Sequence, residues 1–68
     1  MIEQRTSPGN MLTLQEVARI LNVHPNTVRR LVGSGLISAY RISMRGDLRF
    51  RSEDVWLYLD RNRVNGEH

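Results

Sequence analysis

The 68-residue chain contains no cysteine, so it can form neither a disulfide framework nor a thiolate metal site. Its two histidines, His24 and His68, are too few for a zinc site, because a catalytic zinc takes three protein ligands. We therefore expect no metal and no other cofactor. No apolar run approaches a membrane span, and the N-terminus carries an early acid and no hydrophobic stretch. These absences predict a cytoplasmic protein without a membrane partner.

Lysine is also absent, and all ten basic residues are arginines. Residues 24–51 contain six arginines and one acid, Asp47, a formal charge of +5, whereas the rest of the chain contains four arginines and six acids, or −2. A basic patch on one face is typical of proteins that bind polyanions. The alternative, arginines that only keep the surface solvated, predicts no such asymmetry.

The length and composition indicate one small globular domain. A chain this short hides only about 60% of its unfolded surface, so its core is expected to be marginal. Apolar residues make up 40% of the sequence and charged residues 25%, as in ordinary soluble proteins. The serines and carboxylates show no nucleophile with a base and an orienting third group. We therefore expect neither an enzyme nor a small-molecule substrate.

The first helix is predicted to begin after Thr13. Its hydroxyl can accept from the first turn while Glu16 reaches back, which is the capping-box pattern. A stripe at helical spacing follows and is expected to face a core: Leu14, Val17, Ala18 and Leu21. Asn22 tolerates the left-handed conformation that ends a helix, so the chain is expected to reverse there.

A second helix is predicted over residues 25–34, beginning at Pro25, which suits the first helical position. One stripe is apolar (Val28, Leu31 and Val32), and the opposite face is polar and basic (Asn26, Arg29, Arg30 and Gly33). Gly35 is the expected stop. Two short helices joined by so tight a turn indicate a helix-turn-helix.

A two-stranded antiparallel wing is predicted over residues 39–51. Tyr40 and Ile42 alternate with arginine, as do Leu48 and Phe50, which is the period-2 pattern of strands with one buried face. The buried side is expected to hold Ile42, Leu48 and Phe50, and the outer side Arg41, Arg49 and Arg51. Residues 43–47 form the predicted tip.

Ser52 is the predicted cap of a last helix whose first turn carries Glu53 and Asp54. Val55, Trp56 and Leu59 are expected to face inward, and Trp56 to close the core because it has the largest apolar area. The predicted fold class is α+β, a small winged helix-turn-helix of about three helices and a two-stranded wing. We expect residues 1–11 to be a flexible arm, 12–63 the domain and 64–68 a flexible tail.

This order of elements resembles the excisionase and MerR-type winged helix-turn-helix family of small bacterial and phage DNA-binding proteins. The resemblance extends from Met11 to about Arg63, and it rests on short motifs along that stretch: LT at 12–13, EVA at 16–18, TVRRL at 27–31, GLI at 35–37, AYRI at 39–42, RF at 49–50 and DV at 54–55. It implies a sequence-specific double-stranded DNA-binding protein associated with a bacterial or phage nucleoid. The role is then that of an excisionase-like recombination factor or a small MerR-like transcriptional regulator.

The resemblance assigns the major groove to the second helix and the flanking groove or backbone to the wing. The DNA-binding residues that it implies are Asn26, Thr27, Arg29, Arg30, Arg41, Arg45 and Arg49; to these we add His24, which is expected to cap the second helix or to contact a phosphate. Arginine can bind guanine in two places and asparagine can read adenine, so the residue types fit; the helix N-terminus is expected to offer amides to a phosphate. Arg49 has an alternative role in an ion pair with Glu53 or Asp54.

Two departures from the family pattern stand out. His24 occupies a cap position that is usually Ser, Thr or Asp, and Asp47 with Leu48 replaces the basic or polar residues beside the wing glycine, which predicts a weaker phosphate contact from the wing.

No coiled coil follows the last helix, so we expect a monomer that binds next to further copies of itself, on direct repeats about 10 to 10.5 base pairs apart. The alternative function is a protein-interaction domain that docks through Trp56 and Tyr58 without specific DNA binding.

Overall fold

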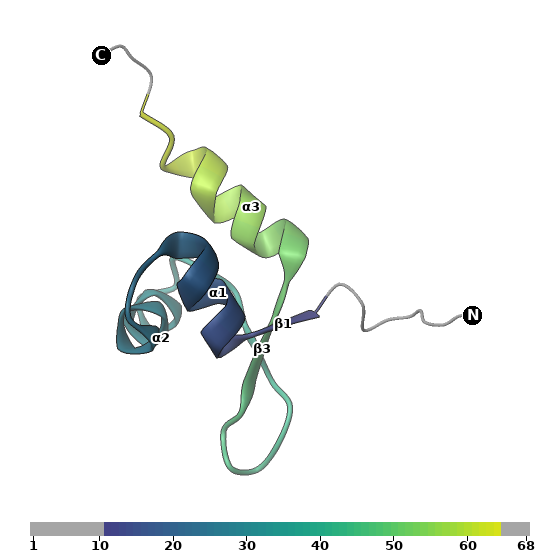
Figure 1. The fold of residues 1–68 in the computed structure, drawn as a ribbon. Helices are drawn as coiled ribbons and strands as arrows, with labels where there is room; N and C mark the ends of the chain where they lie inside the picture. The colour runs from purple at the N-terminus through teal and green to yellow at the C-terminus, as the bar shows by residue number, and fades with distance from the viewer. Residues whose placement is uncertain (1–10, 65–68) are drawn as a thin grey trace, which may run out of the picture.

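The structure, a computed structural model, describes residues 11–64. Its elements are β1 (Met11–Thr13), α1 (Leu14–Leu21), α2 (Pro25–Gly33), β2 (Tyr40–Arg41), β3 (Leu48–Arg51) and α3 (Ser52–Arg61). Helices α1 and α2 lie against each other beside the small sheet, while α3 and the loop that joins β2 to β3 lie at opposite ends of β3 (Figure 1). This is the predicted α+β winged helix-turn-helix class. No helix in the described range is long and apolar enough to cross a membrane.

The predicted ends of α1 are confirmed. The Thr13 hydroxyl accepts from the Glu16 N–H at 3.1 Å, and the Glu16 carboxylate accepts from the Thr13 N–H at 2.8 Å, which completes the capping box. Asn22 adopts the left-handed conformation at φ 60°, and the Val23 N–H donates to the Ala18 carbonyl at 2.9 Å. Satisfying these end groups fixes where the chain turns toward α2.

Helix α2 begins at Pro25 as predicted and ends at Gly33, with Ser34 as its C-cap. Gly35 takes φ 75°, and the Leu36 N–H donates to the Leu31 carbonyl at 2.9 Å. A β-carbon at this φ would be strained, so the expectation that Gly35 ends the helix is confirmed.

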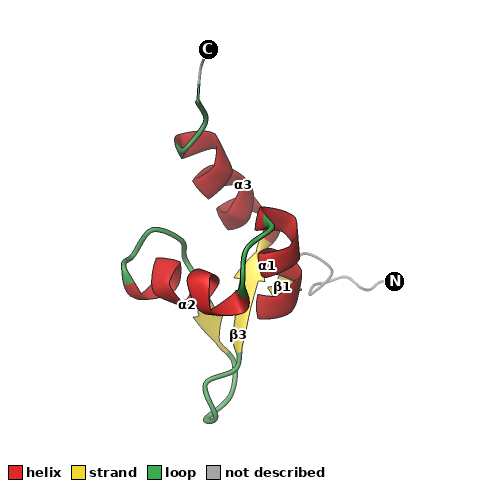
Figure 2. Cartoon of the chain, turned by 60° about the vertical axis from the view of Figure 1, so that its left-hand side comes forward, coloured by secondary structure: helices red, strands yellow, loops and turns green. Residues whose placement is uncertain are grey.

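The sheet has three strands in the order β1-β3-β2, all antiparallel (Figure 2). The third strand, β1, is an addition to the predicted two-stranded wing. Leu12 pairs with Phe50, and Met11, which the sequence predicts to lie in a flexible arm, pairs with Arg51. The chain therefore enters the fold through the sheet. The rest of the predicted arm and the tail from residue 65 onward lie outside the described residues.

The predicted faces of the wing are wrong for β2. Directly opposed residues of antiparallel strands share a face, so Arg41 lies on the face of its partner Leu48, and Tyr40 on that of Arg49. Because Leu48 and Phe50 face the helices, Arg41 does too, while Arg49 and Arg51 lie on the other face. Ile42, predicted to be buried, falls beyond β2 and is 52% exposed.

The core consists of seven buried apolar residues from both helices of the pair, the link after them, β3 and α3: Leu14, Val17, Ala18, Val28, Ile37, Phe50 and Val55. Leu31, Val32 and Tyr58 pack partly against this cluster. Phe50 is completely buried, whereas Trp56 is 54% exposed, so the prediction that Trp56 closes the core is wrong. Leu59 is exposed as well, and Ser52 is the first residue of α3 rather than its cap.

Candidate nucleic-acid interface

The outer face of α2 carries the polar residues that the spacing predicts. Successive helical residues are about 100° apart, so Asn26 and Arg30 lie opposite the buried Val28, and both are exposed. Arg29 lies on one flank of this face and the half-buried Thr27 on the other. The helix therefore presents one asparagine and two arginines to solvent without an acidic residue among them.

His24 caps α2. Its Nδ1 accepts from the Asn26 N–H at 3.0 Å, so in the neutral imidazole the proton is on Nε2, which is available as a donor. The predicted offer of free amides to a phosphate is wrong, because Pro25 has no N–H and the Thr27 N–H donates to the His24 carbonyl at 2.9 Å. The His24 side chain, rather than the helix backbone, is the donor at this end.

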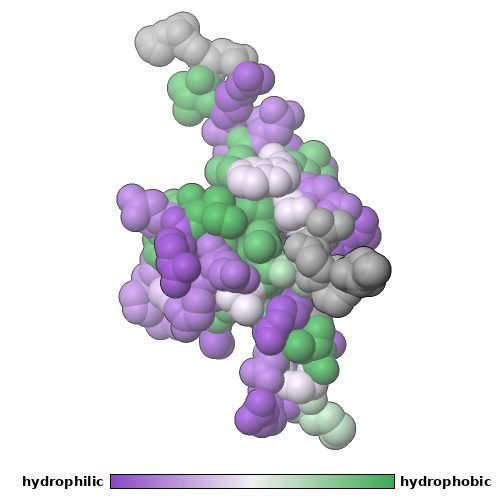
Figure 3. Space-filling view, turned by 45° about the vertical axis from the view of Figure 1, so that its right-hand side comes forward, coloured by the Kyte–Doolittle hydropathy of each residue, from purple (hydrophilic) through white to green (hydrophobic). Residues whose placement is uncertain are grey.

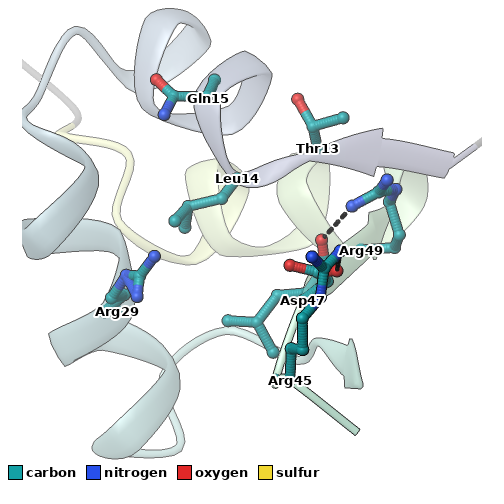
Figure 4. A pocket seen from close by; sticks show the side chains of 9 residues that line it. Thr13, Leu14, Gln15, Arg29, Arg45, Asp47 and Arg49 are labelled. Atoms are coloured by element: carbon teal, nitrogen blue, oxygen red, sulfur yellow. Dashed lines mark hydrogen bonds and ion pairs between the residues drawn. The ribbon is translucent and has the colours of Figure 1, made fainter. Parts of the chain in front are cut away.

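A groove of about 270 Å³ separates α2 from the wing. Arg29 lies on one side, and Arg45, Asp47 and Arg49 lie on the other, with Leu14 between them (Figure 4). Three guanidinium groups against one carboxylate give the lining a formal charge of +2. A groove with positive walls concentrates anions, because the low-dielectric protein focuses its field into the opening.

The wing arginines of the groove are held by neighbours. Arg45 forms an ion pair with Asp47 at 3.1 Å, and Arg49 donates to the Leu48 carbonyl at 2.9 Å. The predicted alternative pairing of Arg49 with Glu53 or Asp54 is wrong: Glu53 pairs with Arg51 at 2.7 Å, and Asp54 forms no ion pair among residues 11–64. The bond from Arg51 lowers the pKa of Glu53, and bonds to Tyr40 and Glu53 raise the pKa of Arg51.

Six of the eight predicted site residues fall into two groups. Arg29, Arg45 and Arg49 are brought together around the groove, next to the exposed face of Asn26 and Arg30. Arg41 lies apart from them on the edge strand β2. It is on the same face of the sheet as Leu48, but its position at the edge leaves it exposed. Arg29, Arg30 and Arg41 form no ion pair within the described part of the chain.

A comparison with known protein families matches residues 11–63 to the helix-turn-helix domain. The chain belongs to the helix-turn-helix domain family. This confirms the family resemblance, and it identifies the protein as a double-stranded DNA-binding protein. Searches of curated proteins and of solved structures found no significant match.

The helix-turn-helix also contributes groove residues that the sequence reasoning missed. Thr13 and Gln15, at the start of α1, line the groove beside the wing. The capping pattern identified Thr13 as a structural residue only, and Gln15 is an exposed polar residue of the kind found on any helix. Their position in the groove depends on β1, which pairs with β3 and so places the start of α1 beside it. The sequence did not predict this strand.

Glu16 lies next to Thr13 at the start of α1 and forms the capping box with it. Its pKa is lowered mainly because the Thr13 backbone N–H donates to its carboxylate, and the nearby charges of Arg19 and Arg49 lower it further. The carboxylate is therefore engaged in the cap of α1, and it offsets part of the arginine charge at the edge of the groove.

The surface away from the groove is different in character. Three apolar side chains of α3 are exposed: Trp56, Leu57 and Leu59. In the space-filling view, hydrophobic surface gathers around the middle of the molecule, and hydrophilic surface dominates the left-hand side (Figure 3). Tyr58, the second residue of the predicted docking face, packs partly against the core instead.

Proposed function

We propose that this helix-turn-helix protein recognises a specific DNA sequence with α2 in the major groove and with the wing on the flanking groove or backbone. The observation that carries the proposal is the arginine-lined groove between Arg29 and the wing residues Arg45 and Arg49. When α2 lies in the major groove of a duplex, the sugar-phosphate backbone of one strand enters the groove between α2 and the wing, where the guanidinium groups neutralise its phosphates.

Within α2, the proposed base readers are Asn26 and Arg30 at the centre of the outer face and Arg29 on its flank toward the groove. Arg30 and Arg29 can each bind guanine O6 and N7, and Asn26 can bind adenine, whereas Thr27 and His24 contact the flanking backbone. Arg30 has no acidic partner in the described chain, so no internal ion pair must break when it meets a base. The wing arginines fix the position of the protein on the duplex.

The biological role that we propose is that of an excisionase-like recombination factor or a small MerR-like transcriptional regulator. A single module of this size buries only about 600 to 1,000 Å² on DNA, which limits its affinity and specificity. We therefore propose that further copies bind on adjacent direct repeats about one helical turn apart. Moving one repeat by half a turn is expected to abolish cooperative binding. Cooperative binding that is unchanged by this shift would exclude the binding of adjacent copies on direct repeats.

A mobility-shift titration on random duplex at several salt concentrations tests DNA binding. Arg45 and Arg49 alone contribute a slope of about −1.8 in a plot of log affinity against log salt, because each phosphate contact contributes about −0.9. Arg45→Ala is expected to reduce the slope by about one. Arg63→Ala removes the same charge far along the chain, where Arg63 has only a 3.9 Å contact with Asp60, and serves as the matched control.

A second candidate function is a protein-interaction domain that uses α3. The 54% exposure of Trp56, together with exposed Leu57, favours it. It predicts no dependence of DNA affinity on Arg45 and a salt slope near zero, since no phosphate would be neutralised. The same titration therefore separates the two functions.

A further inference from the structure

The tip of the wing is a closed β-turn. Within Ser43-Met44-Arg45-Gly46, the Gly46 N–H donates to the Ser43 carbonyl at 3.0 Å, and Gly46 takes φ 91°. The Ile42 N–H donates to the Asp47 carbonyl at 2.9 Å and closes the base of the loop. Met44 and Arg45 are therefore the two central residues of a tight turn at the end of the wing.

Asp47 holds this turn from inside. Its carboxylate accepts from the Ser43 hydroxyl at 3.0 Å and from Arg45 at 3.1 Å, and its N–H donates to the Ser43 hydroxyl at 3.3 Å. These bonds define the shape of the tip before any partner arrives. A partner that uses the tip consequently gains contacts without having to order the loop first.

Met44 is the most exposed large apolar residue of the described chain, with a relative exposure of 102%. An apolar side chain in that position adds no buried area to the fold, so packing does not explain its presence. Its neighbour Arg45 is also highly exposed, at 85% of its side chain. The tip therefore combines one apolar group with one cation.

These features fit one partner surface, the DNA minor groove. Its negative potential attracts arginine, and proteins that bind it frequently insert Met, Leu, Ile, Phe or Pro between base pairs. The minor groove is about 6 Å wide, which suits a two-residue turn better than a helix. Methionine is unbranched and flexible, so it adapts to the gap between two unstacked pairs.

We propose that Met44 enters the minor groove beside the site of α2 and inserts its side chain between two base pairs, with Arg45 in the groove next to it. This inference rests on the proposed function, because α2 must first bring the wing to DNA. Pyrimidine–purine steps unstack most easily, so Met44 makes the protein prefer such a step under the wing. Met44 is then a specificity-determining residue that reads deformability rather than base edges.

The test uses the full chain and a duplex with its selected site, in which the fluorescent base aminopurine replaces successive adenines of the flank. Insertion is expected to raise the fluorescence at one flank position, because unstacking relieves quenching. Met44→Gln and Met44→Ala should abolish this rise and lower the affinity on the order of tenfold, the contribution of one buried methionine side chain. Met44→Leu, which keeps an apolar wedge, should retain both properties.

A second duplex separates specificity from general affinity. Replacing a TA step in the flank with a stiff A-tract should weaken the wild type and Met44→Leu but not Met44→Gln. All three variants should keep the wild-type melting temperature, since Met44 buries nothing in the fold.

If the wild type binds its site with normal salt dependence while Met44→Gln changes neither fluorescence nor step preference, the proposed insertion of Met44 is wrong. If the wild type shows no salt-dependent binding to any duplex, the proposed function itself fails.

Discussion

Helices α1 and α3 contain similar numbers of apolar residues, but α1 buries more of them than α3 does. Helix α1 buries Leu14, Val17 and Ala18 and is closed at both ends by hydrogen bonds. Helix α3 buries only Val55, has no side-chain cap at its start and leaves Trp56 exposed. The difference comes from the neighbours: α1 lies between α2 and the sheet, whereas α3 extends from the end of β3 (Figure 1). Apolar spacing on a helix thus predicts burial only where another element covers the stripe.

The largest expected effect contrasts Phe50 with Trp56. Phe50→Ala removes a completely buried side chain and is expected to cost about 3 to 5 kcal/mol, enough to unfold a domain of this size. Trp56→Ala is expected to cost less than about 1 kcal/mol, because about half of that side chain already faces water. Urea melts followed by circular dichroism measure both values.

Equal destabilisation by Phe50→Ala and Trp56→Ala would contradict the comparison, since it would mean that Trp56 of α3 contributes as much to the core as the fully buried Phe50 of β3.

A smaller effect contrasts the starts of the same two helices. Thr13→Ala removes the hydroxyl that caps α1 and is expected to cost about 1 kcal/mol of stability. Ser52→Ala is the matched control, because Ser52 is already inside α3 and caps nothing; its expected cost is within about 0.5 kcal/mol. Thermal melts of the two variants provide the measurement. A larger loss from Ser52→Ala would show that α3 depends on a cap after all.

Residues with strong local preferences made the helix-turn-helix predictable from the sequence. Asn22 and Gly35 tolerate positive φ, Pro25 fits the first helical turn, and Thr13 with Glu16 forms a cap over four residues. Each of these signals acts within one turn of chain. The two helices and their core stripes were therefore predicted nearly to the residue.

The sheet depended on distant partners and was harder to predict. A strand of three residues such as β1 gives no usable periodicity, and its partner β3 follows more than thirty residues later. The face of β2 depends on its register with β3, and a shift by one residue exchanges the two faces. For the same reason the partners of the wing arginines, Asp47 for Arg45 and Glu53 for Arg51, could not be assigned beforehand.

The central claim is that α2 reads base edges, while the wing arginines contact the flanking groove or backbone and read none. Selection of DNA from a random pool, with the wild type, Arg30→Ala and Arg45→Ala run in parallel, tests it most directly. We expect Arg30→Ala to lose about 1 to 3 kcal/mol on the wild-type site and to relax the preference at one position. Arg45→Ala should select the same sequence as the wild type with uniformly lower affinity. Identical selected sequences from all three proteins would contradict base reading by α2.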